Sequence, residues 1–142
     1  MKKILLSTLL SFFTLTSAYA AHPQCGETEL ASIMSDMKDD MKAIKKAAKA
    51  KDSAQITTVA EQLLSTVQKA DQYVPLSISD SKALTAQQQQ EYDDYKQGIQ
   101  SLEKAVLALT KASSMDEQKA ALGKIGKAAK KGHKAFKMDC DE

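Results

Sequence analysis

Residues 120–136 read AALGKIGKAAKKGHKAF, and the rest of the chain can be arranged around this stretch. Its small and apolar residues recur every three to four positions, which is typical of a helix with one buried face. At about 100° per residue, His133 lies about 20° from Leu122 and about 40° from Ala129. The pattern therefore predicts that His133 points where apolar side chains point. A hydrogen-bonded core histidine and a metal ligand are both compatible with that position.

The same helical spacing runs back through the chain and predicts three more helices. Capping-box motifs, in which Ser, Thr or Asp is followed three residues later by Glu or Gln, occur at 52–55, 85–88 and 114–117. They predict the starts of the second, third and fourth helices. The first helix has a single apolar stripe, which is made of Leu30, Ile33, Met34, Met37, Met41, Ile44 and Ala48.

The expected ends of these helices follow from local signals. The first helix should run from Gly26 or Glu27 to about Ala50, and Val74–Pro75 should end the second, because a residue before proline avoids the helical region. The fourth should reach about Met138. Short loops make consecutive helices antiparallel neighbours, so we predict an all-α, up-down-up-down four-helix bundle.

Residues 1–20 have the pattern of a secretory signal peptide. Lys2 and Lys3 precede an apolar run from Ile4 to Leu15, and Ala18-Tyr-Ala20 is an A-x-A cleavage site. The run is too short to be a membrane span. We therefore expect a cleaved signal, one domain over residues 21–142 without a membrane span, and export to a bacterial periplasm.

The charge pattern argues against a nucleic-acid partner. Without Lys2 and Lys3, 18 basic residues stand against 18 acidic ones, and every basic residue is a lysine. Neither a basic excess nor an arginine fork is available for phosphate. No nucleophile–base pair, phosphate loop or close carboxylate constellation is present either, so we do not expect an enzyme. Asp36, Asp39 and Asp40 form an acidic cluster, which fits solvated surface better than a docking site.

Two cysteines, Cys25 and Cys140, lie near the two ends of the mature chain. In an oxidising compartment an even pair suggests a disulfide, which would place the start of the first helix beside the end of the last. A pair of metal-binding or redox thiols is the alternative, although no Cys-x-x-Cys motif or nearby histidine supports it.

The predicted topology brings Met34 and His133 together. Met34 follows Cys25 by nine residues, about 13 Å along a helix, and His133 precedes Cys140 by seven, about 10 Å. Bonded cysteines would place the two side chains at nearly the same depth. A thioether opposite an imidazole is the axial pair of a low-spin haem iron. Met37 and Met41 share the stripe with Met34, and a methionine stripe is more often ordinary core packing.

Three glycines inside the fourth helix, Gly123, Gly126 and Gly132, also need an explanation, because each lowers helix stability by about 1 kcal/mol relative to alanine. Gly126 lies one heptad before His133 on the same face. Clearance for a flat ring is one explanation, and close helix–helix packing is the other.

These features resemble the cytochrome b562 family over essentially the whole mature chain. Residues 34–44 match its N-terminal segment, with Met34 on the methionine ligand, and residues 92–99 resemble a segment of its third helix. Residues 133–136 match the histidine ligand and the aromatic residue three positions later. The resemblance implies a periplasmic electron-transfer protein with one non-covalent b-type haem, for which Met34 and His133 are the axial ligands. No Cys-x-x-Cys-His motif is present for a covalent haem.

The chain departs from the family pattern in its cysteine pair and in having no arginine near His133. Lysines such as Lys130, Lys131 and Lys134 would have to face the haem propionates. We expect a monomer with an unidentified periplasmic redox partner. The alternatives are a haem-free binding or structural bundle, and copper binding by the Ala21-His22 terminus of the mature chain with the methionines.

Overall fold

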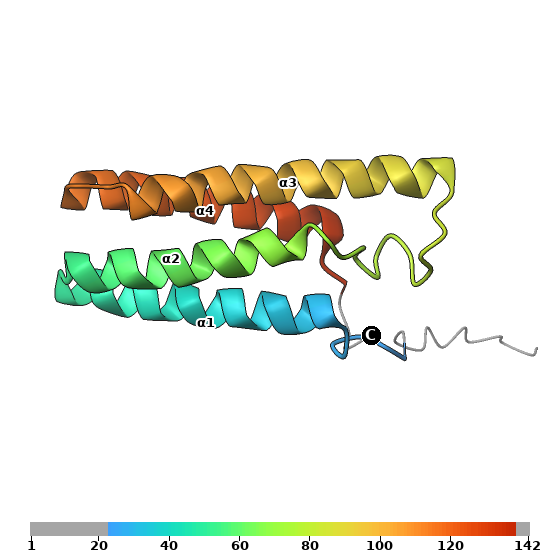
Figure 1. The fold of residues 1–142 in the computed structure, drawn as a ribbon, viewed down its shortest axis with the longest axis horizontal. Helices are drawn as coiled ribbons and strands as arrows, with labels where there is room; N and C mark the ends of the chain where they lie inside the picture. Colours follow the sequence, from blue (N-terminus) through green and yellow to red (C-terminus); the bar gives the residue numbers. More distant parts are fainter. Residues whose placement is uncertain (1–22, 139–142) are drawn as a thin grey trace, which may run out of the picture.

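The computed structural model describes residues 23–138, and these residues form four helices and no strand. The helices are α1 (Glu29–Ala50), α2 (Ser53–Ala70), α3 (Ala86–Thr110) and α4 (Met115–Phe136). They run alternately up and down, so that α1 starts and α4 ends at the same end of the bundle (Figure 1). The predicted all-α, antiparallel four-helix bundle is confirmed.

Side-chain caps define where the helices begin. Asp52, Thr85 and Ser114 each accept a hydrogen bond from the backbone N–H three residues later, at 2.9, 3.2 and 3.2 Å. These bonds satisfy amide groups that have no partner inside the helix. Thr28 caps α1 in the same way, at 3.1 Å, so α1 begins at Glu29, slightly later than expected.

The second helix ends at Ala70, four residues before the Val74–Pro75 pair that was expected to end it. The hydroxyl of Tyr95 donates to the carbonyl of Ala70 at 2.9 Å, and the hydroxyl of Tyr92 donates to the carbonyl of Asp71 at 2.6 Å. Both tyrosines belong to α3. Carbonyls at the end of α2 are therefore satisfied by bonds to a neighbouring helix before the proline is reached.

The core lies between the helices and also includes Ile78 from the long connection between α2 and α3. Ile78 of that connection is 8 % exposed, and its carbonyl accepts a hydrogen bond from the side-chain amide of Gln88 at 3.0 Å. The largest fully buried aliphatic side chains are those of Ile44, Ile56, Leu63, Val67, Val106, Leu109 and Ile125.

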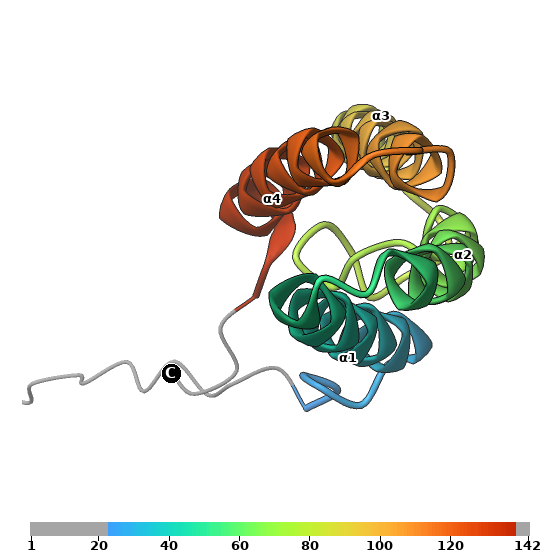
Figure 2. The ribbon, with the colours of Figure 1, turned by 90° about the vertical axis from the view of Figure 1, so that its left-hand side faces the viewer.

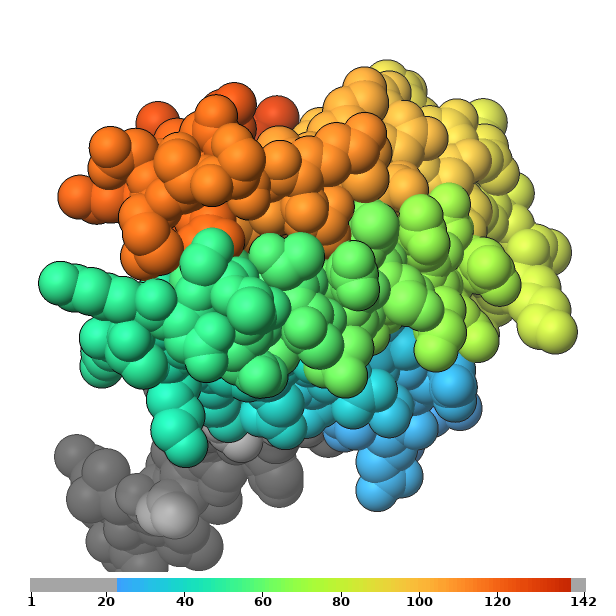
Figure 3. All heavy atoms as spheres, turned by 60° about the vertical axis from the view of Figure 1, so that its left-hand side comes forward, coloured from blue at the N-terminus to red at the C-terminus, as the bar shows by residue number. Residues whose placement is uncertain are grey.

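The four helices are not packed equally against one another. Neighbours in the chain pack closely, α1 on α2, α2 on α3 and α3 on α4, whereas α1 and α4 do not pack closely. Viewed along the bundle, the ribbons form an arc whose two ends, α1 and α4, lie apart (Figure 2). On the opposite side, the side chains of α2 meet those of α3 along their length (Figure 3). The bundle therefore has one side that no helix–helix packing closes.

Some expectations concern residues that the structure does not describe. The signal peptide of residues 1–20, its cleavage site and the boundary of the mature domain lie outside the described span and stay predictions. Within residues 23–138, none of the helices combines the length and the apolarity that a membrane crossing requires.

Candidate functional site

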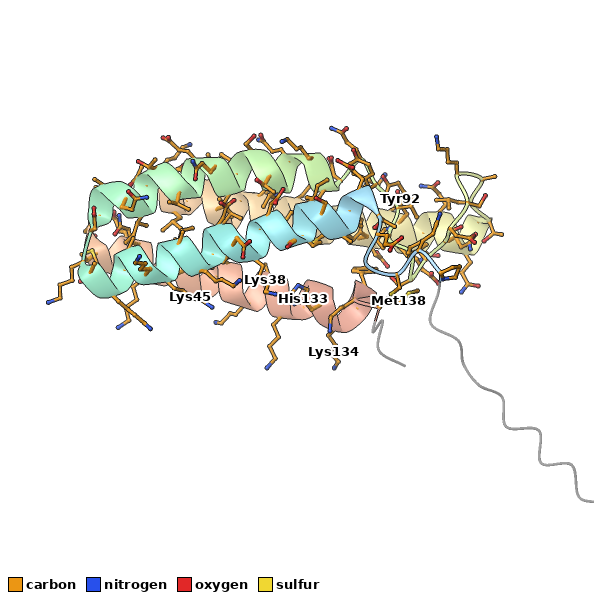
Figure 4. The ribbon with its side chains drawn as sticks, turned by 90° about the horizontal axis from the view of Figure 1, so that it is seen from below. Lys38, Lys45, Tyr92, His133, Lys134 and Met138 are labelled. Atoms are coloured by element: carbon orange, nitrogen blue, oxygen red, sulfur yellow. The ribbon has the colours of Figure 1, made fainter. Side chains whose placement is uncertain are left out.

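The unclosed side of the bundle carries both residues of the predicted ligand pair. Figure 4 shows Lys38 and Lys45 on the flank of α1 that turns toward α4, and His133 on the flank of α4 that turns toward α1. Met34 lies about 40° and 20° around α1 from those two lysines, and therefore on the same flank. Together these two flanks are called the α1–α4 face below. Met34 is half-buried there and packs against the edge of the core. A soft thioether and an imidazole therefore lie on the facing flanks of two helices that do not pack closely against each other.

The three methionines of α1 are not equivalent, although the sequence placed them on one stripe. Met37 is 7 % exposed and belongs to the core, so it does not reach the α1–α4 face. Met41, like Met34, is half-buried and lies about 20° from it around the helix. Met41 is therefore the methionine that competes with Met34 for a ligand role.

His133 is exposed in the structure, so the expectation that it points into the core is wrong. The hydrogen-bonded core histidine is also excluded, because the ring makes no hydrogen bond within the described residues. The reason is that α4 packs on α3 but not on α1, which leaves the side chains on its α1 flank uncovered. Figure 4 shows His133 on that flank, near the level of Lys38 of α1.

The levels of the two side chains along the bundle favour Met34 over Met41 as the counterpart of His133. Met34 lies five residues after the start of α1, about 8 Å along its axis, and His133 lies three residues before the end of α4, about 5 Å. These two helix ends lie at the same end of the bundle (Figure 1). The levels of Met34 and His133 along the bundle axis therefore differ by no more than about one helical turn. Met41 is two turns deeper.

The end of α4 is held in place by aromatic packing one turn after His133. The ring of Phe136 stands edge-on to the ring of Tyr95, with centroids 5.5 Å apart, and Tyr95 stacks in turn on Tyr92. The hydroxyl of Ser77 donates to the carbonyl of Phe136 at 2.8 Å. Side chains from α3 and from the connection before it thus fix the last turn of α4, and with it the position of His133.

The space beside His133 is open at the glycine one heptad earlier. A Cβ atom built on Gly126 would meet no heavy atom within 4 Å, and the same holds for Gly123 and Gly132. Close helix–helix packing therefore does not explain these glycines. The other explanation, clearance for a flat ring, still fits Gly126, because Gly126 points about 20° from the direction of His133 around α4.

Two shallow hollows of about 350 and 330 Å³ lie elsewhere. The first lies between α3 and α4, around Ala105 and Ala128, and the second between α1 and α2, around Ala43 and Ala47. Neither includes Met34 or His133. Because these hollows carry neither the thioether nor the imidazole, the α1–α4 face is the better candidate for a cofactor.

The charges on α1 separate to opposite flanks, which sequence inspection missed. Lys38 and Lys45 lie on the α1–α4 face, about 40° and 20° from Met34 (Figure 4). The acidic cluster of Asp36, Asp39 and Asp40 lies on the side of α1 that faces α2, and part of its charge is paired locally. Asp39 pairs with Lys42 at 2.7 Å, which lowers the pKa of Asp39, whereas partial burial, followed by the charge of Asp36, raises the pKa of Asp40. A helical wheel of α1 would have shown the separation.

The remaining candidate residues lie at or beyond the ends of the described span. Cys25 is within it, but Cys140 is outside, so the disulfide stays a prediction. The Ala21-His22 terminus of the copper alternative is also outside. Within residues 23–138 no cluster of three or more His, Cys, Asp or Glu side chains could hold a metal ion.

Comparison with known proteins gives one match. A family model described as Cytochrome b562 matches residues 29–137, which is most of the chain. No curated protein and no solved structure matches. The matched range starts with α1 and extends one residue beyond α4, so it includes Met34, His133 and the helices that present them.

Proposed function

The chain belongs to the cytochrome b562 family of electron-carrying haem proteins, which are not enzymes, and we propose that it carries electrons on one non-covalent b-type haem with Met34 and His133 as axial ligands. The observation that supports this most is their placement. A half-buried thioether and an exposed imidazole border the one side of the bundle that helix packing leaves open, within about one turn of each other.

The donor set and the surroundings fit such a group. Bound there, a haem would supply a one-electron iron couple. Met34 would contribute a soft sulfur ligand, which favours the ferrous state, and His133 a neutral imidazole nitrogen. Gly126 leaves space beside His133, while the packing of Phe136 on Tyr95 keeps the imidazole on its flank. If Met34 and His133 both held the iron, the chemistry that the haem would supply is outer-sphere electron transfer.

We further propose that the protein works in the periplasm as a monomer. The support is the pattern of residues 1–20, with a charged start, an apolar run and an A-x-A site. The cysteine pair is consistent with an oxidising compartment. The mass of the exported protein tests the cleavage of residues 1–20, and its change on reduction and thiol alkylation tests the cysteine pair. The native mass in solution tests the monomer.

The experiment that tests the haem proposal is an absorption spectrum of the full chain expressed with its N-terminal segment, oxidised and then reduced with dithionite. A Soret band that sharpens on reduction, with split α and β bands, is the expected result. His133→Ala and Met34→Ala should each abolish the six-coordinate spectrum. Met41→Ala is the matched control, because Met41 is half-buried on the same flank of α1, and it should keep the spectrum.

Two results would contradict the proposal. A protein that stays colourless after titration with haemin has no such site. A six-coordinate spectrum that is lost in Met41→Ala but kept in Met34→Ala would show that Met41, and not Met34, is the ligand. Treatment with EDTA separates haem from copper, because a chelator removes copper held by the Ala21-His22 terminus and leaves haem in place.

A further inference from the structure

The two lysines of α1 nearest in direction to Met34 and the two of α4 nearest in direction to His133 border the α1–α4 face, and no acidic residue of either helix lies among them. They are referred to as the lysine rim and are Lys38, Lys45, Lys119 and Lys130. All four are exposed, and none takes part in an ion pair within the described residues. Figure 4 shows Lys38 and Lys45 on the flank of α1 that faces α4.

The helix geometry shows how strictly the charges separate. On α1 the rim lysines lie within about 40° of Met34, whereas the acidic residues lie at least about 120° away from it. Those acids are Glu29, Asp36, Asp39 and Asp40. On α4 the rim lysines lie within about 60° of His133, and the two acidic residues, Asp116 and Glu117, lie at least about 100° away.

This separation is a property of one face and not of the whole protein. The mature chain carries equal numbers of basic and acidic residues, so its net charge is near zero. Its electric field is therefore directional, positive over the α1–α4 face, on which Met34 and His133 lie. Fields of this kind steer a partner of opposite charge and orient it before contact.

Haem carboxylates alone do not account for the rim. A b-type haem brings two propionates, fewer than the four lysines. The rim also extends along the bundle: Lys45 lies about 16 Å from Met34 along α1, and Lys119 about 21 Å from His133 along α4. Lysines at those distances are placed to act on something larger than the cofactor.

We propose that the lysine rim is the docking surface for an electron-transfer protein with an acidic surface, which would meet this chain over the α1–α4 face. The proposal rests on the proposed function, since it identifies the chemistry of the redox partner. It assigns the partner to the face where the ligand pair lies, and it excludes the acidic cluster of α1, which faces α2, as the docking site.

The kinetic test compares two small oxidants of opposite charge. The reduced, haem-loaded protein is mixed with hexacyanoferrate(III), which is an anion, or with tris(phenanthroline)cobalt(III), which is a cation, over a range of ionic strength. The rate with the anion should fall as salt rises, and the rate with the cation should rise. Rates that depend on salt in the same way for both oxidants would overturn the proposal.

A matched pair of charge variants locates the effect. The rim variant is K38Q/K45Q/K119Q/K130Q, and the control variant removes the same charge from exposed lysines on other faces, K69Q/K82Q/K104Q/K124Q. At low ionic strength the rim variant should react with the anion about tenfold more slowly than the parent, while the control stays within about twofold. Equal losses in both variants would show a net-charge effect and overturn the assignment to the rim.

A second readout does not depend on the haem. Titration of ¹⁵N-labelled, haem-free protein with an acidic flavodoxin should shift amide signals of α1 and α4 around the rim, and the rim variant should abolish the shifts. Shifts confined to α2 and α3 would overturn the proposal, as would rim-dependent binding to phosphatidylglycerol vesicles without binding to flavodoxin. Loss of the haem signature alone would contradict the proposed function and leave this titration interpretable.

Discussion

The rings of Tyr95 and Phe136 meet edge to face, with centroids 5.5 Å apart, and this contact joins α3 to the last turn of α4. Tyr95 is 4 % exposed and is also bonded to the end of α2 through its hydroxyl. Three of the four helices are therefore connected at the end of the bundle where His133 lies. The contact is structural, but it bears directly on the candidate site.

The first prediction concerns Phe136→Ala. Because the ring is half-buried, its removal should lower the free energy of unfolding by about 2 kcal/mol. Removal of a fully buried phenylalanine ring lowers it by about 3–5 kcal/mol. Because the last turn of α4 then loses its aromatic contact with α3, the affinity for haem should fall about tenfold. Urea unfolding and haemin titration at the Soret band measure the two effects.

Leu64→Ala is the control for that variant. Leu64 is half-buried against the same core but belongs to α2, away from the end of α4. It should lower stability by a similar amount without changing haem affinity. Phe136→Ala protein that binds haemin as tightly as the parent would show that the contact does not position His133.

The second prediction concerns alkaline stability. Burial, followed by the charges of Tyr92 and Asp71, raises the pKa of Tyr95 above the ordinary tyrosine value of 10.0. Above pH 10 the unfolded chain therefore releases a proton that the folded protein retains. The stabilisation is complete below pH 10 and is lost as the pH rises toward the folded-state pKa, by at most about 1.4 kcal/mol per pH unit.

Tyr95→Phe separates this effect from the titration of lysines. At pH 7 the variant should be less stable than the parent by about 1 kcal/mol, since the bond to the carbonyl of Ala70 is lost. Above pH 10 the difference should shrink, because the variant has no late-titrating phenol. Absorbance at 295 nm and urea unfolding at several pH values follow both; a difference that stays constant up to pH 11 would contradict the pKa shift.

Local signals predicted most of the fold. The caps at Asp52, Thr85 and Ser114 fixed three helix starts, because a cap is made by residues that are close in sequence. The end of α2 was missed because it depends on bonds from Tyr92 and Tyr95, more than twenty residues away. No local pattern contains that information.

The candidate site was predictable in part, for a related reason. A helical wheel gives the direction of His133 around α4, and that direction was correct relative to Leu122 and Ala129. A helical wheel does not show whether another helix packs over that side of α4. No helix packs closely there, so His133 is exposed. For the same reason the sequence analysis treated Met34, Met37 and Met41 alike, although only Met37 of the three is buried in the structure.

The third prediction concerns Gln118, a polar side chain that is 1 % exposed near the start of α4. Its amide nitrogen donates to the hydroxyl of Ser53 at 2.7 Å, but its Oε1 atom has no partner among the described residues. Gln118→Leu removes the unpaired acceptor and leaves the exposed Ser53 to water. The free energy of unfolding should rise by about 1 kcal/mol.

Gln118→Glu should have the opposite effect on stability. It places a carboxylate in the same buried position, so stability should fall well below that of the parent at pH 7 and recover as the pH is lowered and the carboxyl takes up a proton. If Gln118→Leu is instead less stable than the parent, the bonds to Ser53 outweigh the unpaired oxygen.

The fourth prediction concerns Gly126, where an added side chain meets open space. Gly126→Ala should raise the stability of the haem-free protein by about 0.5–1 kcal/mol, because the folded helix gains no clash and the unfolded chain loses freedom. Gly126→Leu should also fold, but its side chain would occupy the α1–α4 face. Haem affinity should therefore fall at least tenfold, measured by haemin titration.

Gly123→Leu is the matched control, because Gly123 lies on the same helix, is equally unobstructed and points about 80° away from the direction of His133. It should fold equally well and bind haem like the parent. The comparison depends on direction alone, since both variants add the same atoms to the same helix. Equal haem affinity in the two variants would mean that the cofactor does not lie beside Gly126, and loss in both would point to a general effect on α4.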